Sequence, residues 1–289
     1  MKYLIMNADE TLGEKVAQWL MQMTEVGNIR VGISDSGKRD FFKKLKIDTV
    51  LVDYEANDSI KKAMDQTNVI VYIPKQEDLS TSIAHFERIL ENVQQIQATL
   101  IFVSFFADQE ANPYLLSPFY GYALRRLAGS DIKYTVIKNS LFADPLIPAL
   151  SQIIKDKEIS YPVKDQSVSF ITQNDSAHAI AACCMLKMMH GHGEKYVLTM
   201  EQNYNMVELA YLMTRATEKS IGYNPLSSAK FIEKNPHDKL EASLYQAARL
   251  GELDQVTNDF RKLTGREPEE LEHFLRNGYQ ISKLHALNL

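Results

Sequence analysis

The amino-acid sequence predicts an α/β fold with a doubly wound, mostly parallel sheet. Over the first 140 residues short apolar runs alternate with longer stretches of helical periodicity, the pattern of repeated β-α-β units. The runs are nearly all apolar, as strands must be when helices cover both faces of a sheet. They predict strands at residues 3–6, 29–33, 49–52, 69–73, 99–104 and 134–138.

Helical periodicity fills the intervals between these strands, at residues 12–23, 59–66, 80–95 and 117–127. Because crossovers between parallel strands are right-handed, these units predict helices on both faces of one sheet. Further along we expect a strand near 168–171, a helix at about 174–189 and a strand at 196–199 that returns to the sheet edge. Open sheets of this kind hold ligands at the carboxyl ends of their strands, where the strand order reverses.

The remainder of the chain predicts a small, mainly helical C-terminal cap. From residue 205 onward we expect helices and loops, with helices at 206–216, 237–250 and 269–277 and a frayed end from about residue 280. The expected organisation is a dinucleotide-binding (Rossmann-type) domain at 1–145, to which 166–200 returns, and a smaller subdomain formed by 146–165 and 201–289. Together they would enclose a cleft for a small-molecule ligand at the carboxyl edge of the sheet.

The amino-acid composition limits which kinds of molecule the protein can bind. The 289 residues carry 32 Lys and Arg against 37 Asp and Glu, which argues against nucleic acid because phosphate binding requires clustered cations. No apolar run is long enough to cross a bilayer, and the start of the chain turns polar too soon for a signal peptide. We therefore expect no membrane contact and a cytoplasmic location, while the sequence indicates no particular protein partner.

Several segments, taken in order, resemble the NmrA-like branch of the short-chain dehydrogenase/reductase superfamily over nearly the whole chain. They are the strand-turn-helix at 3–20, Val52-Asp53-Tyr54 before 59–63, and the segments 130–137, 195–199, 208–210 and 264–266. The stretch 105–122 also resembles relatives labelled nucleoside-diphosphate-sugar epimerases. The resemblance implies a fold that binds NAD or NADP, with NAD(P)H quinone reductases among the relatives.

The resemblance places the diphosphate of a cofactor at the turn after the first strand, where relatives carry Gly-x-x-Gly-x-x-Gly. Here that spacing gives Asn7, Glu10 and Gly13, so only the glycine that lets the helix pack on the strand remains. A unit charge on Glu10 about 5 Å from a phosphate would cost roughly 3 kcal/mol at an effective dielectric near 20. Alternatively, Thr11 and Glu14 match a capping box that simply starts the helix. We expect weak or no dinucleotide binding, with NAD and NADP both left open.

Other candidate cofactor contacts come from the ends of later strands. Ser34 stands where NADP-preferring relatives carry an Arg, although Lys38 and Arg39 are near enough to substitute. The following Asp35 could accept ribose hydroxyls of NAD or merely form a turn. The full candidate set is Asn7, Glu10, Thr11, Leu12, Gly13, Ser34, Asp53, Tyr54, Pro74 and Phe105.

Active members of the superfamily use a Tyr that is acidified by a Lys one helical turn later. Counting back from Tyr134 puts these positions at Leu116 and Tyr120, so the pair is absent. A comparable spacing is Tyr122-x-x-x-Arg126, but two residues span about 200° of a helix, so Tyr122 would face away from the site that Tyr120 faces. Tyr120 and Tyr122 remain as the candidate catalytic residues.

Metal binding is not expected. His190-Gly191-His192 has no partnering Cys or carboxylate at ligand spacing, so we predict a turn there. Aromatic and apolar residues instead gather at the predicted strand ends, where they could form a pocket for a flat ring. They are Tyr54, Tyr72, Pro74, Phe105, Phe106, Tyr120 and Phe142.

Two functions are compatible with these features. The degenerate phosphate turn and the missing Tyr/Lys pair favour a ligand-sensing or regulatory protein. The alternative is an atypical NAD(P)H-dependent oxidoreductase acting on quinones or carbonyls, or an epimerase-like enzyme. Direct hydride transfer needs mainly the orientation of cofactor and acceptor, so the missing pair does not exclude reduction.

Overall fold

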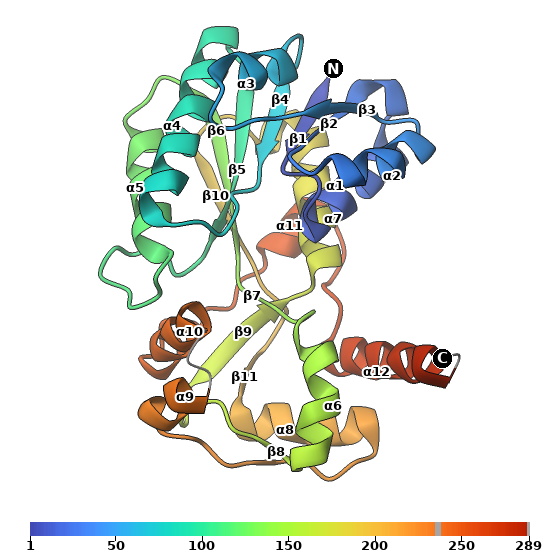
Figure 1. The fold of residues 1–289 in the computed structure, drawn as a ribbon, viewed down its shortest axis with the longest axis vertical. Coiled ribbons are helices and arrows are strands. Elements are labelled where there is room, and N and C mark those ends of the chain that lie inside the picture. Colours follow the sequence, from blue (N-terminus) through green and yellow to red (C-terminus); the bar gives the residue numbers. More distant parts are fainter. Residues whose placement is uncertain (235–237, 288–289) are drawn as a thin grey trace.

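A seven-stranded parallel sheet forms the centre of the upper lobe in Figure 1. The structure is a computed structural model, which describes residues 1–234 and 238–287. The strand order is β10-β6-β5-β4-β1-β2-β3, and every neighbouring pair is parallel, which confirms the doubly wound fold. The strands are β1 (Tyr3–Met6), β2 (Ile29–Ile33), β3 (Asp48–Leu51), β4 (Val69–Tyr72), β5 (Thr99–Phe105), β6 (Lys133–Asn139) and β10 (Glu194–Leu198).

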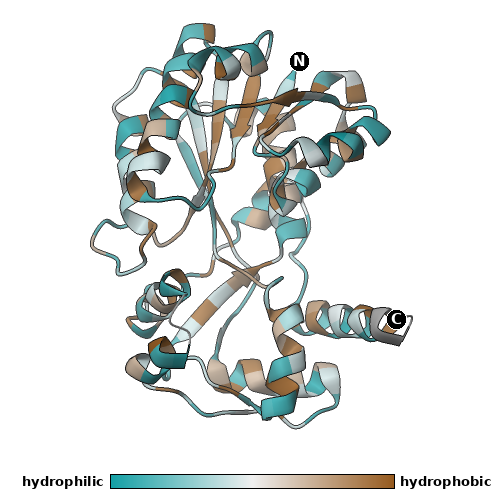
Figure 2. Ribbon diagram, in the orientation of Figure 1, coloured by the Kyte–Doolittle hydropathy of each residue, from teal (hydrophilic) through white to brown (hydrophobic). Residues whose placement is uncertain are grey.

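Helices cover both faces of this sheet and make it a three-layer structure. One layer holds α1 (Thr11–Met23), α2 (Arg39–Lys44), α7 (Gln173–Met185) and α11 (Asp259–Thr264), and the other holds α3 (Asn57–Met64), α4 (Leu79–Ile96) and α5 (Ser117–Ala128). Alternate residues of β1 serve the two layers: Tyr3 and Ile5 pack with the first, and Leu4 and Met6 with the second. Figure 2 shows the hydrophobic residues on the central strands and polar ones along the outer helix faces.

The lower lobe is the cap, and it contains two small sheets besides its helices. A three-stranded sheet has the order β11 (Asn203–Asn205), β9 (Ser167–Ile171), β7 (Leu141–Phe142), and β12 (Gly222–Tyr223) pairs with β8 (Glu158–Ile159). The helices are α6 (Leu146–Asp156), α8 (Met206–Thr217), α9 (Ser228–Lys234), α10 (Lys239–Arg249) and α12 (Leu271–Leu287). Short 3-10 turns lie at Val26–Asn28, Ser36–Lys38 and Lys187–Met189.

The structure differs from the sequence-based predictions mainly in the cap. The strand expected near 168–171 pairs with β7 and β11 of the cap instead of lying in the main lobe. By contrast, β10 pairs in the main sheet and α7 packs on α1, as expected for segments that return to the main lobe. Residues 259–264 lie in the segment that was expected to belong to the cap, but they form helix α11, which packs on α7 and β10 of the main lobe. The expectation of helices and loops alone after residue 205 was wrong, because β12 pairs with β8. The start of the helix expected at 237–250 lies partly outside the described residues, which resume just before α10.

The frayed end expected from residue 280 was also wrong, because α12 continues to Leu287. Leu271 and Leu275 of this helix are fully buried in the core of the cap, where α12 packs on α6 and α8. No helix among the described residues is both long and apolar enough to cross a membrane.

The strand order reverses between β1 and β4, which creates a crevice at the carboxyl ends of the strands. Helix α1 begins at this crevice, and Gly13 holds it close to the strand. A Cβ atom on Gly13 would lie 2.6 Å from the Ala8 Cα and 2.7 Å from the Asn7 carbonyl oxygen, both of them backbone atoms that cannot easily move. The glycine is therefore required by packing alone.

Replacing Gly13 with Ala should lower the free energy of unfolding by about 1–3 kcal/mol, because the added methyl group forces α1 away from the β1 turn. Urea denaturation followed by circular dichroism measures the change. Gly27→Ala is the matched control, since a Cβ atom there meets no atom within 4 Å. Equal stability of the Gly13 variant and wild type would contradict the packing argument.

Candidate functional site

The turn between β1 and α1 keeps a glycine-like backbone without its glycines. Asn7 has a positive φ of 58°, and its Nδ2 donates to the Ile73 carbonyl at 2.7 Å. Glu10 is the N-cap of α1, and its side chain makes no capping hydrogen bond. The predicted capping box was wrong, because the Glu14 carboxylate pairs with Lys38 at 2.5 Å instead. The first-turn N–H groups of α1, which include those of Thr11, thus have no side-chain cap and remain suited to an anion.

The buried acid of this turn is Asp9. Its Oδ2 accepts the Ser34 N–H at 3.0 Å, the Ser34 hydroxyl at 2.8 Å and the Asp35 N–H at 2.9 Å, which ties the turn to the end of β2. Burial by itself raises the pKa of Asp9, but these donors and the nearby Lys75 outweigh it, so the pKa lies below the ordinary value of 3.8. Its Oδ1 is buried and accepts no hydrogen bond from any described residue.

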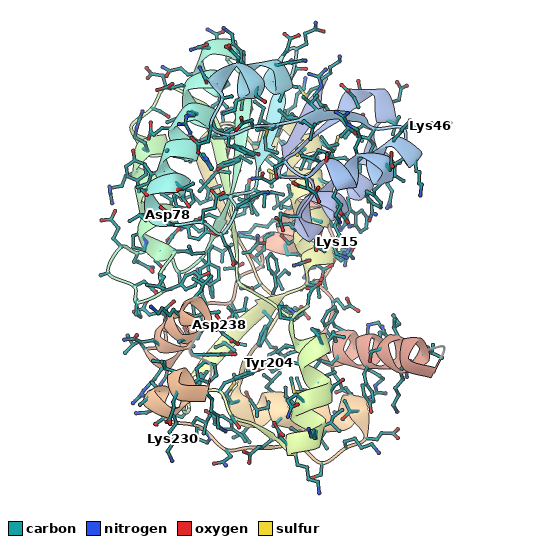
Figure 3. All side chains as sticks on the ribbon, in the orientation of Figure 1. Lys15, Lys46, Asp78, Tyr204, Lys230 and Asp238 are labelled. Atoms are coloured by element: carbon teal, nitrogen blue, oxygen red, sulfur yellow. The ribbon has the colours of Figure 1, made fainter. Side chains whose placement is uncertain are left out.

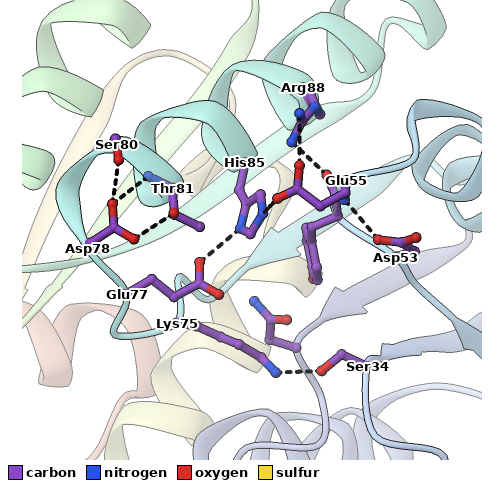
Figure 4. A network of polar contacts seen from close by, with 12 residues as sticks. Ser34, Asp53, Glu55, Lys75, Glu77, Asp78, Ser80, Thr81, His85 and Arg88 are labelled. Atoms are coloured by element: carbon purple, nitrogen blue, oxygen red, sulfur yellow. Dashed lines mark hydrogen bonds and ion pairs between the residues drawn. The ribbon is translucent and has the colours of Figure 1, made fainter.

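Lys75 brings a positive charge into the same turn, as Figure 4 shows. Its ammonium donates to the Ser34 hydroxyl at 2.5 Å and lies 3.8 Å from Asp9 and 4.0 Å from Glu10. The Glu10 side chain itself is 58% exposed. Sequence reasoning missed Lys75, although its position directly after Pro74, at the end of β4, was a usable signal.

A buried histidine of α4, seen in Figure 4, joins the loop after β3 to the loop after β4. His85 lies between two carboxylates, with Nδ1 2.8 Å from Glu77 and Nε2 2.8 Å from Glu55. The bonds from His85 and Arg88 hold the pKa of the exposed Glu55 below its usual value. This network fixes the loops that follow β3 and β4.

The two residues predicted after β3 have different environments. Tyr54 is buried beside His85, with the two rings 5.3 Å apart, and burial raises its pKa well above the ordinary value. Asp53 is exposed, and its Oδ1 accepts the N–H of Glu55 at 2.9 Å. These contacts tie the two residues to α4 and to the loop after β3, and a role of either residue in cofactor binding stays a prediction.

A cavity of about 580 Å³ lies between the carboxyl edge of the main sheet and the cap. Leu12, Pro74, Phe105 and Tyr120 from the predicted residues line its main-sheet side. Its cap side comes from segments that the sequence did not single out, and Figure 3 shows Asp238 at the start of α10, on the side of the cap that faces the main lobe. The additional polar or aromatic lining residues include Tyr114, Ser140, Tyr161, Asp238, Glu241 and Tyr245.

The two catalytic candidates occupy different environments. Tyr120 lines the cavity, and burial raises its pKa to about 12. The Tyr122 hydroxyl donates to Glu87 of α4 at 2.7 Å, and Arg126 pairs with the same carboxylate at 3.0 Å, so this pair faces the neighbouring helix instead of the cavity. Nowhere in the described chain do three or more His, Cys, Asp or Glu side chains gather in a way that could hold a metal ion.

Comparison with known proteins gives structural matches alone. No family model and no curated protein matches the sequence. A nucleoside-diphosphate-sugar epimerase structure from Staphylococcus aureus is 29% identical with a TM-score of 0.89, and the match covers 96% of this chain and 100% of that one.

Two enzyme complexes also match. Citrobacter sp. triphenylmethane reductase complexed with NADP(H) is 20% identical (TM-score 0.86, 96% of this chain and 100% of that one). The NADPH-dependent quinone oxidoreductase from Escherichia coli complexed with NADPH is 19% identical (TM-score 0.87, 95% and 99%). The structural neighbours are therefore epimerase- and reductase-like proteins of the NAD(P)-binding fold, which confirms the resemblance to NmrA-like proteins.

Replacing Asp9 with Asn should lower the free energy of unfolding near neutral pH by about 1–2 kcal/mol, because hydrogen bonds to a charged acceptor are stronger than those to a neutral one. The wild-type advantage is present above the ordinary Asp value of 3.8 and disappears as the pH falls through the lowered pKa of the folded protein. Urea denaturation from neutral into acid pH measures it. Asp35→Asn is the control, since that exposed carboxylate accepts only a local N–H, from Gly37, among the bonds described. A difference independent of pH would exclude this role.

Proposed function

We propose that this protein is an NAD(P)H-dependent reductase that delivers hydride to a flat, largely apolar acceptor in the cavity at the carboxyl edge of the main sheet. The observation that carries the proposal is the cavity itself. It extends from Leu12 of α1 and Pro74, beside the phosphate turn, to the aromatic residues of the cap. A single continuous space can thus hold the reactive end of a dinucleotide and a ring-shaped acceptor side by side.

The residues of the turn fit a dinucleotide. The uncapped first turn of α1 and the Lys75 ammonium would meet the diphosphate, while Ser34 and Asp9 lie where a ribose is held at the end of β2. Because the Glu10 carboxylate is 58% exposed, water screens its charge and reduces the penalty expected from the sequence. When bound, a reduced nicotinamide supplies hydride. Complexes of two structural neighbours with NADP(H) and NADPH support this assignment.

The cavity favours reduction over epimerisation. An epimerase cycle requires a base to remove a hydroxyl proton. Tyr114 and Tyr120 are the phenols that line the cavity from the main lobe. Burial raises the pKa of Tyr120 to about 12 and that of Tyr114 well above its ordinary value, so both stay protonated near neutral pH and are poor bases. Hydride transfer depends chiefly on the orientation of donor and acceptor, which the aromatic walls can provide.

A ligand-sensing protein is the second candidate, and the arrangement of Asp9 favours it. The carboxylate already occupies the N–H groups of Ser34 and Asp35, so those donors are satisfied without a ligand. In that case the cavity would bind its ligand without a dinucleotide and without turnover. Dinucleotide binding separates the two candidates.

Thermal-shift titration with millimolar NADH and NADPH tests the proposal, since a ligand at one hundred times its Kd stabilises a fold by about 2.7 kcal/mol. Oxidation of the same cofactors in the presence of menadione then measures turnover. Ala149→Phe, which places a ring in the cavity from α6, should abolish turnover but retain the cofactor-induced shift.

Ser151→Phe is the matched control, because Ser151 is exposed on the same helix. It should reduce menadione at the wild-type rate. Absence of any shift with either cofactor would eliminate the reductase and leave the sensing protein, whereas turnover that survives Ala149→Phe would place the reaction outside this cavity.

A further inference from the structure

The Asp9 carboxylate occupies the hydrogen-bond donors at the carboxyl end of β2. Its Oδ2 accepts the Ser34 N–H at 3.0 Å, the Ser34 hydroxyl at 2.8 Å and the Asp35 N–H at 2.9 Å. Successive backbone N–H groups that converge in this way commonly bind a phosphate. Here a carboxylate of the chain itself fills that place, and its side chain is only 5% exposed. A second anion at the end of β2 would find these donors in use and a negative charge among them.

The hydrogen-bonding capacity that remains in this turn suits donors. Asp9 Oδ1 and Asn7 Oδ1 are buried, and neither has a hydrogen-bond partner among the described residues. The bond from Asn7 Nδ2 to the Ile73 carbonyl fixes which amide atom is free, and both free oxygens can only accept. Buried polar atoms are almost always satisfied, so two unpaired acceptors in one turn point to a ligand that brings hydroxyl groups.

The nearby cations do not reverse this preference. The Lys75 ammonium lies 3.8 Å from one carboxylate of the turn and 4.0 Å from another, so its charge is already offset. Lys38 is paired with Glu14 at 2.5 Å. Arg39 is exposed, so water and salt screen its charge. The end of β2 therefore has a buried negative charge and only screened or paired positive ones.

We propose that this site selects NADH over NADPH, and that Asp9 is the residue that selects. The 2′-hydroxyl of the adenosine ribose in NADH can donate to an acceptor of the turn. In NADPH the same position carries a phosphate, which is largely doubly ionised near neutral pH and would meet the carboxylate. The inference rests on the proposed function for the presence of a dinucleotide. It separates this chain from two structural neighbours, whose complexes contain NADP(H) and NADPH.

The origin of the acid distinguishes this arrangement from the common one, in which an acidic residue at the end of the second strand accepts the ribose hydroxyls itself. Asp35 stands at that point, but it is exposed and its carboxylate accepts the Gly37 N–H at 2.8 Å as the cap of a short 3-10 turn. Asp9 reaches the end of β2 from the turn after β1 instead. The sequence pattern points to Asp35, whereas the folded structure points to Asp9.

Calorimetric titration with NADH and NADPH near neutral pH tests the inference without turnover. Two unit charges about 5 Å apart at an effective dielectric near 20 would produce a difference in affinity of about a hundredfold, and Lys75 offsets part of it. Wild type should therefore bind NADH about tenfold more tightly than NADPH. Asp9→Asn keeps the size of the side chain but removes its charge, so the two dissociation constants should become nearly equal. Because this variant also loosens the fold and weakens both cofactors alike, their ratio is the readout.

Two further variants separate Asp9 from the other acids near the end of β2. Asp40→Asn removes one exposed charge from α2 and is the matched control, which should retain the wild-type preference. Asp35→Asn removes the acid at the commonly used position and should retain it as well. Loss of the preference in Asp35→Asn, with retention in Asp9→Asn, would assign the selection to the end of β2 and overturn the inference.

The pH dependence of the preference is a readout that a loosened fold would not produce. A phosphate monoester gains its second charge near a pKa of about 6, whereas Asp9 stays ionised there because its own pKa lies below 3.8. The preference for NAD⁺ over NADP⁺, which tolerate mild acid, should therefore increase as the pH rises through about 6. Asp9→Asn should remove most of this increase, and its persistence would assign the repulsion to another group. The other charged or titratable groups that face Asp9 are Glu10, Asp35, Lys38, Tyr54 and Lys75.

The outcomes separate this inference from the proposed function. Tighter binding of NADH through Asp9, without oxidation of NADH by menadione, would refute the reductase and retain the selection. Turnover with equal affinity for both cofactors, or tighter binding of NADPH, would retain the reductase and refute the selection. Absence of binding by either cofactor would refute both.

Discussion

The close approach of Gly13 to the backbone of Asn7 and Ala8 is the constraint on which the site depends. Because no side chain separates α1 from the β1 turn, the start of the helix lies at the point where the strand order reverses. Its first-turn N–H groups therefore face the crevice, and Leu12 reaches the wall of the cavity. The retention of this one glycine keeps α1 packed against the β1 turn even though the other two positions of the spacing have side chains.

The electrostatics of that turn differ from what its acidic sequence indicates. The penalty expected for a phosphate assumed an uncompensated carboxylate at Glu10. In the structure Glu10 extends toward water, the buried carboxylate is that of Asp9, and the Lys75 ammonium lies within 4.0 Å of both. A cation from the end of β4 thus offsets charges that arise at the end of β1, and only the folded arrangement brings them together.

Periodicity in the sequence was sufficient for the main sheet but not for the cap. Buried parallel strands are continuous apolar runs, so β1 and β2 could be placed to the residue. Strands of two residues, such as β8 and β12, are too short to show the alternation of apolar and polar residues that marks a strand. The capping box failed because Glu14 has a distant partner, and the frayed end failed because α12 is held by contacts with α6, including Gly278 against Ile147. The face of α10 that meets the cavity likewise could not be predicted, because it depends on how the helix packs in the folded chain.

The path of the chain between the lobes limits how the molecule can be divided. It leaves the main sheet after β6, re-enters at α7, leaves again after β10, re-enters at α11 and leaves once more for α12. Helix α7 covers α1, with Ile180 and Cys183 in the same core as Val16 and Leu20. A fragment ending near residue 145 would expose that core to water, so the first 145 residues cannot be excised as an independent module, and any engineered exchange of caps must splice several segments at once.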